Sequence, residues 1–558
     1  MKKIPYGESD FRKVKLENFY YIDKTHFIPK IEMQPSFLFL IRPRRFGKSL
    51  FLNMLAFYYD VYYKDEFEAV LGDTYIYKNP TKEASSYYIL KFDFSAVSTK
   101  GDIDKNFSYV CNVDIEAFLK KYKIDLKIDK EKPAHKNLYY LLKQLNIPIY
   151  VMIDEYDNFI NNLLMHDQQD YKKLVSSKSE AIYKEFFKLL KAGTSDNNSS
   201  IKKMFITGVS PLAMYDVTSG SNIGTNITNE YIFNDAVGVT REELAKLLDY
   251  YSLSHINHPL DLDYWYDNYK FNRHIKYTIY NTDMILYYVK SLILTQRPPD
   301  NLVDLNVRTD YSKLRYLVYT DNKLNGNFSL LHQLLGKGYV TTLELKDSFS
   351  AFELKKTNNF ISLLYYLGLI TIDKRYRGKI YLKIPNQTIQ RIMAEYIQRA
   401  LEESEIFDID LNEFKNTLQE FAYDSSLNVF HYLAKEIEER SKVRDYISGE
   451  SFVKGFFTAY LGLSPFYGVL TEQERNKGFV DIYLRTAPNI EDEITEGLIE
   501  LKYIPRSKFS DKVLEKEVAQ AKKQLKQYNP QGFEMGVVVV FSGWEMVYCE
   551  KYLYGKVK

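Results

Sequence analysis

The segment Arg42–Ser49, with the sequence RPRRFGKS, constrains the fold of this 558-residue chain more than any other segment. It lies between an apolar run, Phe37–Ile41, and a run with helical periodicity, Ser49–Asp60. A tight loop between a buried strand and a helix directs backbone N–H groups and the positive end of the helix dipole at one point, where a phosphate binds well. The sequence therefore predicts a P-loop that binds a nucleotide.

The end of this segment matches the general pattern G-x-x-x-x-G-K-[ST], but Arg42 stands where the first glycine belongs. Lys48 is expected to reach the β- and γ-phosphates and the Ser49 hydroxyl to coordinate Mg²⁺. The three arginines of the segment either bind phosphate directly or distort the cradle, so hydrolysis is left open. ATP and Mg²⁺ are the expected cofactors. The expected cofactor-binding residues are Arg44, Arg45, Phe46, Gly47, Lys48, Ser49 and Asp154.

The last of these residues follows a second apolar run, Ile147–Ile153, which ends in Asp154 and Glu155. Asp154 is expected to hold Mg²⁺ through water, and Glu155 to orient or deprotonate the attacking water; a helix cap is the alternative. A further strand-like run ends near Thr207 and Ser210. These two side chains lie either near the γ-phosphate or in a plain turn.

Composition and charge set the class of protein. About 45% of the residues are hydrophobic and 27% are charged, as in globular proteins, and 75 basic residues balance 73 acidic ones. Two cysteines exclude a disulfide scaffold, the N-terminus lacks the apolar region of a signal peptide, and no run is apolar enough to span a membrane. We expect a cytoplasmic protein, with homo-oligomerisation left open.

Strand-like and helical runs alternate over the first ~235 residues, which predicts a parallel sheet with flanking helices. A capping box at Thr240 then begins a mainly helical part. Within it, a helix over 360–366 precedes strands over 369–372 and 379–384 with a basic tip between them, which indicates either a winged helix or a small α+β connector. We expect an α/β multidomain chain with three domains, 1–239, 240–400 and 401–558.

Five short runs resemble the bacterial AAA-ATPase-like family, over roughly residues 4–235. They are Phe11-Arg12, Tyr20–Thr25, Arg42–Ser49, Ile153–Asp157 and Ile206–Ser210. That family also carries R-P-R-R-F-G-K-S, so Arg42 departs from general P-loops and not from the family. The resemblance implies a C-terminal domain of the PD-(D/E)XK nuclease superfamily.

Such nucleases hold Mg²⁺ with two carboxylates and use a lysine to position or activate water. Glu500 and Lys502 are two residues apart on the predicted strand 497–503, so they share one face, and Asp481 lies on the preceding predicted strand. Asp481, Glu500 and Lys502 are the expected catalytic residues, with Glu155 in the N-terminal domain, and Asp481 and Glu500 are the expected metal ligands. A surface Glu–Lys pair is the alternative.

The nuclease resemblance implies further polar positions. Glu472 precedes the Asp481 strand, and Gln524 lies on the following helix with Gln520 as its rival. Glu450, in the first turn of an earlier helix, is either a metal or supporting carboxylate or an ordinary first-turn glutamate.

Together these features predict an ATP-binding protein, with hydrolysis open, coupled to a Mg²⁺-dependent nuclease-like domain that acts on nucleic acid, with DNA expected. Defence, mobile-element biology and repair are all compatible with it. The alternatives are a signalling or scaffold ATPase whose nuclease fold only binds a partner, and a small-molecule phosphotransferase.

Overall fold

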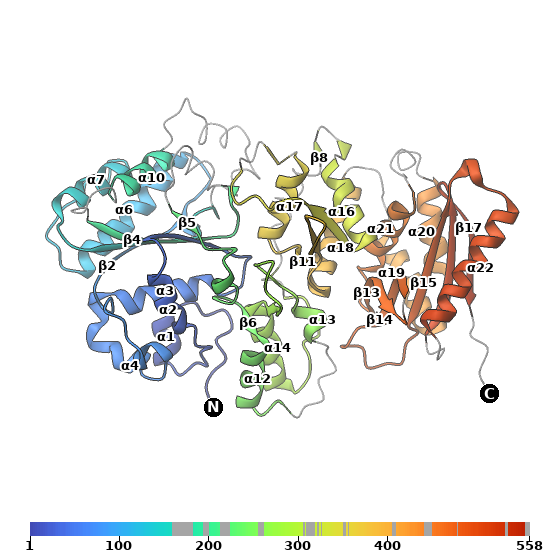
Figure 1. Ribbon diagram of the computed structural model, residues 1–558, viewed down its shortest axis with the longest axis horizontal. Helices are drawn as coiled ribbons and strands as arrows, with labels where there is room; N and C mark the ends of the chain where they lie inside the picture. Colours follow the sequence, from blue (N-terminus) through green and yellow to red (C-terminus); the bar gives the residue numbers. More distant parts are fainter. Residues whose placement is uncertain are drawn as a thin grey trace.

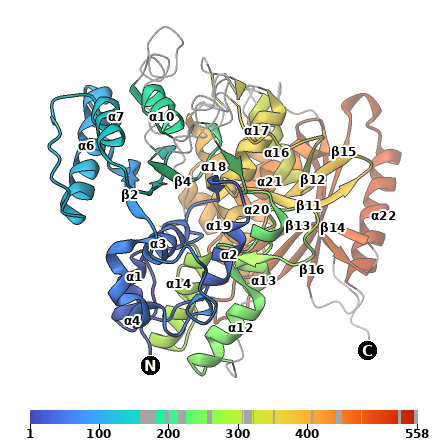
Figure 2. The same ribbon diagram turned by 60° about the vertical axis from the view of Figure 1, so that its left-hand side comes forward.

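The computed structural model describes residues 1–158, 182–193, 200–212, 224–254, 262–304, 307, 319–320, 323–324, 326–349, 353–354, 356–403, 409–439, 449–476, 478–529 and 534–552. Figure 1 shows an N-terminal sheet with helices, a central part rich in helices, and a second sheet towards the C-terminus. The turned view in Figure 2 again places the central helices between the two sheets. The chain is therefore an α/β multidomain protein, as predicted.

The N-terminal sheet has five parallel strands in the order β2-β3-β4-β1-β5. They are β1 (Phe37–Ile41), β2 (Tyr88–Asp93), β3 (Ile149–Asp154), β4 (Ile201–Gly208) and β5 (Thr225–Asn226). Because helices cover both faces, the strands are near-continuous apolar runs, and every residue of β3 is buried. Since β4 lies between β1 and β3, the ends of these three strands meet at one edge of the sheet.

Helices cover the two faces of this sheet separately (Figure 1). On one face lie α1 (Phe11–Leu16), α2 (Ile28–Glu32), α3 (Lys48–Tyr59) and α4 (Phe67–Leu71), and on the other α6 (Ile103–Lys121), α7 (Ala134–Gln144) and α10 (Ile182–Ala192). Short segments connect them: α5 (Tyr75–Lys78) and the 3-10 helices Thr25–Phe27, Val61–Glu66, Phe94–Ala96 and Tyr231–Phe233.

The predicted capping box is present at the start of the central part. The Thr240 hydroxyl accepts from the Glu243 backbone N–H, and the Glu243 carboxylate accepts from the Thr240 N–H. The elements that follow are α12 (Arg241–Tyr250), α13 (Leu262–Tyr266) and α14 (Thr282–Thr295), with the paired short strands β6 (Val239–Thr240) and β7 (Ile279–Tyr280), and β8 (Tyr319–Thr320) and β9 (Lys323–Leu324).

Next comes a helix–strand–helix–hairpin unit with the strand order β10-β12-β11, the arrangement of a winged helix. Its elements are α16 (Gly326–Lys337), β10 (Tyr339–Thr342), α17 (Thr357–Tyr366), β11 (Thr371–Tyr376) and β12 (Lys379–Lys383). The expected six-residue tip is wrong: β11 continues to Tyr376, leaving a two-residue turn. Arg377 and Gly378 have φ values of 48° and 81°, which suit the tight turns that join twisted strands.

From α21 onward the C-terminal part runs in the order helix, three strands, helix and two strands, the order that the nuclease resemblance implies except for the last strand. Its helices are α18 (Gln387–Glu403), α19 (Leu411–Asp424), α20 (Asn428–Glu439), α21 (Glu450–Leu461) and α22 (Asp511–Tyr528), with the 3-10 helix Arg506–Lys508. Its strands are β13 (Tyr467–Arg475), β14 (Gly478–Thr486), β15 (Gly497–Ile504), β16 (Met535–Ser542) and β17 (Glu545–Tyr552), and the sheet has this order. Only β15 and β16 pair in parallel, and β17 is an unpredicted edge strand.

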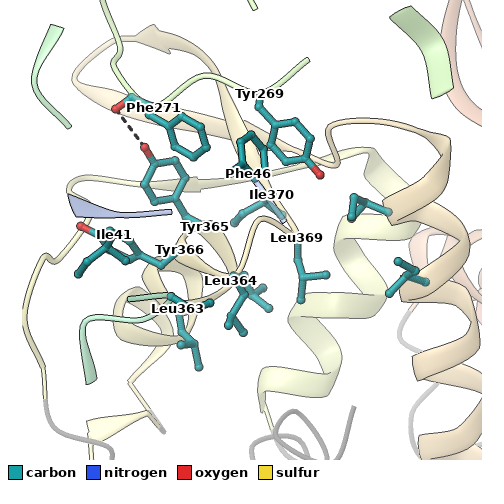
Figure 3. Close-up of a cluster of buried hydrophobic side chains, with 14 of the residues drawn as sticks. Ile41, Phe46, Tyr269, Phe271, Leu363, Leu364, Tyr365, Tyr366, Leu369 and Ile370 are labelled. Carbon is teal, nitrogen blue, oxygen red and sulfur yellow. Dashed lines mark hydrogen bonds between the residues drawn. The ribbon is translucent and has the colours of Figure 1, made fainter. Parts of the chain in front are cut away.

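The winged-helix unit packs directly against the P-loop end of the first sheet. Figure 3 shows Phe46 beside Tyr269 and Phe271, with Tyr365 donating a hydrogen bond to the backbone of Phe271. Gly368, just after α17, has a φ of +76°, and a Cβ there would lie 2.7 Å from Pro43. Only glycine permits this contact between the unit and the P-loop.

Candidate nucleotide and nuclease sites

The backbone of the P-loop segment is held in the conformation that a phosphate cradle needs. Arg45 and Gly47 have φ values of 69° and 92°, so the chain turns sharply before α3 begins at Lys48. Arg44, Arg45, Gly47, Lys48 and Ser49 line a pocket of about 540 Å³, together with Glu155. The first turn of α3 thus faces an open space beside an acidic side chain, as the sequence predicted.

Lys48 is buried at the floor of this pocket. Its Nζ donates to the carbonyl oxygen of Pro43 at 2.9 Å. Burial lowers the pKa of Lys48 to about 8, although the carboxylates of Asp154 and Glu155 oppose the shift. A buried ammonium with a single backbone partner is unfavourable alone, and an anionic ligand in the pocket would relieve this cost.

Arg42 does not face the pocket. Its guanidinium is fully buried and donates to the carbonyls of Thr228, at 2.6 Å, and Phe233, at 2.8 Å, while it stacks 4.0 Å from the Phe271 ring centre. The expectation that Arg42 either binds phosphate or distorts the cradle is therefore wrong. Its side chain holds the segments after β5 against the P-loop strand instead.

Phe46 was expected to bind the cofactor, but its side chain is also buried in the core, in the aromatic cluster of Figure 3. Its carbonyl oxygen accepts from the Gly238 N–H and the Thr282 hydroxyl, both at 2.9 Å. Only the backbone N–H of Phe46 remains as a group that could approach a phosphate.

Asp154 and Glu155 lie at the carboxyl end of β3, next to the P-loop. The Thr207 hydroxyl on neighbouring β4 donates to Asp154 Oδ1 at 2.5 Å. Glu155 has a φ of 49°, and burial raises the pKa of its carboxyl against the opposing charge of Lys48. A carboxyl with a raised pKa suits proton transfer, and Asp154 is the better placed of the two to hold a cation with its hydroxyl partner.

Ser210 follows β4 at the same edge of the sheet, and its backbone bonds to residues that follow β3. Its backbone N–H donates to Asp157 Oδ2 at 2.7 Å and its carbonyl accepts from the Tyr156 hydroxyl at 2.7 Å. Asp157 also accepts from the Val209 N–H at 3.0 Å. Asp157 thus fixes the turn after β4, and of the two candidates Thr207 alone bonds to Asp154.

The start of α14 forms a further wall of the pocket that the sequence did not indicate. Three consecutive carbonyls of the P-loop, those of residues 44, 45 and 46, accept hydrogen bonds from the Asn281 side chain, the Asp283 N–H and the Thr282 hydroxyl, at 3.2, 3.2 and 2.9 Å. Residues 5 and 7–9 also line the pocket. Burial raises the pKa of Asp283 to about 6, and Arg45 opposes the shift.

In the C-terminal sheet the structure brings Asp481, Glu500 and Lys502 together. Asp481 Oδ2 accepts from the Leu501 N–H at 2.9 Å, and Lys502 Nζ donates to Glu500 Oε1 at 2.7 Å. Burial and the charge of Asp481 raise the pKa of Glu500 to about 8, and Lys502 opposes this. Both carboxylates are nearly inaccessible, at 8% and 1% exposure, which rules out an ordinary surface Glu–Lys pair.

Lys454, on α21, is a site residue that the sequence analysis missed. Its Nζ donates to Asp481 Oδ1 at 2.8 Å and to Glu472. Burial lowers the pKa of Lys454, but the charges of Asp481 and Glu472 outweigh it, so the pKa is raised. The side chain is buried and lies 27 residues before Asp481, with no local pattern to mark it.

The remaining predicted positions lie around this centre. Glu450 begins α21 at the exposed rim, where partial desolvation and the charge of Asp481 raise its pKa. Glu472 has a φ of 50° at a break in the pairing of β13 and β14. Gln524 donates to the Tyr528 hydroxyl at 3.1 Å, and its Oε1 is buried without a partner, whereas Gln520 is exposed.

The donor set fits one Mg²⁺ ion that keeps several waters. Glu500 Oε2 is buried without a hydrogen-bond partner, and the Glu500 carboxyl lies close to that of Asp481. Within the described residues no group of three or more His, Cys, Asp or Glu side chains gathers closely enough to hold a metal. Mg²⁺ is commonly held by one or two carboxylates and water, so Asp481 and Glu500 suffice as protein ligands.

The fold and these two sites define a P-loop nucleotide-binding protein with a nuclease-type α/β domain. Residues 5–218 match the family described as predicted AAA-ATPase, and residues 448–551 match the PD-(D/E)XK nuclease superfamily. The chain therefore carries an AAA-ATPase-like domain and a C-terminal PD-(D/E)XK nuclease superfamily domain, which confirms both resemblances.

Individual relatives add little to this assignment. An uncharacterized protein in the vnfD 5′ region of Azotobacter chroococcum mcd 1 is 50% identical over 56 residues, which are 10% of this chain and 11% of that protein. The structure of the Aeropyrum pernix ORC1 protein in complex with DNA matches with a TM-score of 0.23 and 12% identity, covering 70% of this chain and 93% of that one. A score this low supports no inference. In the described part, no helix is long and apolar enough to cross a membrane.

Proposed function

We propose that this chain is an ATP-binding protein whose C-terminal domain cleaves phosphodiester bonds in nucleic acid with Mg²⁺. The observation that carries the proposal is the cluster of the buried carboxylates Asp481 and Glu500 with the partly buried Lys502, in which one carboxylate oxygen of Glu500 lacks a partner. Two buried carboxylates and a lysine cost stability and require a function to justify them. Mg²⁺ at this cluster would supply Lewis-acid stabilisation of the phosphodiester oxygens.

The residues of the cluster then have separate roles. Asp481 and Glu500 hold the ion, and Lys502, bonded to Glu500, positions the attacking water or neutralises the charge that develops on the phosphate. Glu472, Glu450 and Gln524 support these groups. In the N-terminal pocket Arg44, Arg45, Gly47, Lys48 and Ser49 hold the phosphates, Asp154 and Ser49 hold Mg²⁺, and Glu155 serves as general base if ATP is hydrolysed.

We place the domain boundaries at 239/240 and 400/401 and the protein in the cytoplasm. The setting is defence against foreign DNA, mobile-element biology or repair. Support for ATP control of the nuclease comes from the packing of α17 and Gly368 on the P-loop and of α16 on α21, where the His332 and Phe452 rings stack at 4.5 Å.

The test uses the purified full-length chain with Mg²⁺ or Mn²⁺, with and without ATP, on single-stranded DNA, duplex DNA and RNA. We expect cleavage that D481N, E500Q and K502M each abolish. The matched control is E344Q/K346M, because Glu344 and Lys346 form the same Glu-x-Lys pair, 2.6 Å apart, on an exposed loop. If no metal or nucleotide supports cleavage, the chain is the scaffold ATPase of the alternative interpretation.

A further inference from the structure

The winged-helix unit presents its sheet to solvent and not its helix. In a winged helix that reads duplex DNA, a helix enters the major groove. Here residues 359–366 of α17 are all buried, because the helix packs into the cluster of Figure 3. Tyr365 and Tyr366 both hydrogen-bond to Asn229 of the N-terminal domain. This helix is therefore not available for a DNA groove.

The opposite face of the unit is basic and aromatic. We call the outer face of β10, β12 and β11 the platform. Strand register places Tyr339, Tyr381, Tyr376 and Lys374 on this one face, since Lys374 pairs with Tyr381 and Tyr376 with Lys379. The Tyr339 and Tyr376 rings are 46% and 53% exposed, which is unusual for large side chains on a folded sheet.

The exposed charged side chains of the β11–β12 hairpin are mostly positive. Lys374, Arg375, Arg377 and Lys379 are all exposed, and in the described part of the chain none of the four forms an ion pair with a carboxylate. The single acid of the hairpin, Asp373, is already paired with Lys383 at 3.1 Å. Lys374 and Arg377 instead lie over the Tyr381 and Tyr376 rings, 5.6 and 5.3 Å from the ring centres. Four cations that no carboxylate holds, beside partly exposed rings, match the alternating phosphates and bases of a single strand.

The platform also adjoins the nuclease centre. Gly338, immediately before β10, lies against β13: a Cβ there would be 3.8 Å from Thr471 and 3.9 Å from Glu472. Glu472 is bonded to Lys454, which is bonded to Asp481. Phe479, on the same face of β14 as Asp481 and 53% exposed, adds another accessible ring at this end. Figure 2 shows the β11–β12 hairpin extending on the side of the C-terminal sheet.

We propose that the platform binds single-stranded nucleic acid, stacking bases on Tyr339 and Tyr376 and pairing phosphates with the hairpin cations, and so leads the strand to Asp481 and Glu500. The proposal rests on the proposed nuclease function for its purpose, but not for the binding itself. Stacking requires unpaired bases, so the platform distinguishes single strands from duplexes, whereas the cations attract both.

Binding is measured in EDTA, where no cleavage occurs, by fluorescence anisotropy of labelled single-stranded DNA, single-stranded RNA and duplex DNA, each of about 20 nucleotides or base pairs. We expect Y339A/Y376A to weaken single-strand binding by at least about tenfold and duplex binding by far less. Y339F/Y376F keeps the rings and should bind normally. Y109A/Y139A is the matched control, since these tyrosines, 70% and 52% exposed, lie on the N-terminal helices.

The charge variant K374Q/R375Q/R377Q should lower the slope of log affinity against log salt by about 2 for single strands. The affinities for the single-stranded DNA and single-stranded RNA probes show which of the two the platform prefers. The proposal is overturned if duplex binds as tightly as single strands, or if Y339A/Y376A binds single strands like the wild type. Binding without any cleavage would instead refute the nuclease function and leave the platform standing.

Discussion

Replacing Lys48 with methionine tests whether this lysine is kept for a ligand and not for the fold. Lys48 is 7% exposed, and its Nζ donates to the carbonyl oxygen of Pro43. Burial lowers its pKa from 10.5 to about 8. Because the folded-state pKa is depressed, its contribution to stability is present above pH 10.5 and is lost as the pH falls through 8.

The pKa difference sets the size of the effect. At pH 7 the charged lysine costs about 3 kcal/mol, and at pH 9.5 about 1 kcal/mol, because the folded protein has by then lost the proton. Methionine removes this cost but leaves the Pro43 carbonyl without its donor, which costs about 1 kcal/mol. We therefore expect K48M to be more stable than wild type by about 2 kcal/mol at pH 7 and nearly equal to it at pH 9.5.

Urea unfolding at both pH values, with and without MgATP, measures this. MgATP at 100 times its Kd should stabilise the wild type by about 2.7 kcal/mol and K48M not at all. K64M, at an exposed lysine of the same domain, is the control and should change neither quantity. The reasoning would be refuted if K48M were less stable than wild type at pH 7. It would also be refuted if the difference in unfolding free energy between the two proteins were the same at both pH values.

Other changes probe the sites separately. K454M leaves the buried charge of Asp481 uncompensated and should lower the free energy of unfolding in urea by about 3 kcal/mol, whereas K454R should recover part of it; no loss would contradict the charge argument. G208A places a Cβ 2.4 Å from the Tyr156 ring and should cost about 1–3 kcal/mol in the same assay. Because the pKa of Glu500 in the folded protein is about 8, its protonated carboxyl contributes to the stability of the metal-free protein. This contribution is fully present below pH 4.5 and is lost as the pH rises through 8. Mn²⁺ affinity by calorimetry should accordingly rise between pH 6 and 8, and a flat profile would refute it.

Sequence patterns predicted the parts of this fold that depend on neighbouring residues. The apolar run before the P-loop is strand β1, and the capping box at Thr240 begins α12, because both signals are local. The nuclease resemblance indicated Asp481, Glu500 and Lys502, and strand periodicity placed Glu500 and Lys502 on one face, where the structure shows them hydrogen-bonded. The edge strand β17 was missed because both of its faces are only partly buried and its residues show no clear alternation.

The residues that were missed or misplaced depend on contacts distant in sequence. Arg42 was expected either to bind phosphate or to distort the cradle because of its place in the loop, but its guanidinium binds the carbonyls of Thr228 and Phe233, nearly two hundred positions away, instead. Lys454 joins the nuclease centre only because α21 packs beside β13 and β15. Such pairings follow from tertiary packing, and a single sequence carries no local signal for them.

The contacts at the P-loop are of a different type from those beside the nuclease centre. This difference affects how the nucleotide pocket could influence the nuclease centre. At the P-loop, α14 is joined by three directional hydrogen bonds, so the loop and this helix have to move together. At α16 and α21 the link is the stacked His332 and Phe452, and burial lowers the His332 pKa to about 4, so the ring is neutral. The two helices also approach closely at Gly336 and Gly455, where an added Cβ would lie 2.5 Å from the Ser451 carbonyl oxygen and 2.4 Å from the His332 ring. Such tight packing makes α16 and α21 move together, and because α21 also carries Lys454, a displacement of α16 would act on Asp481.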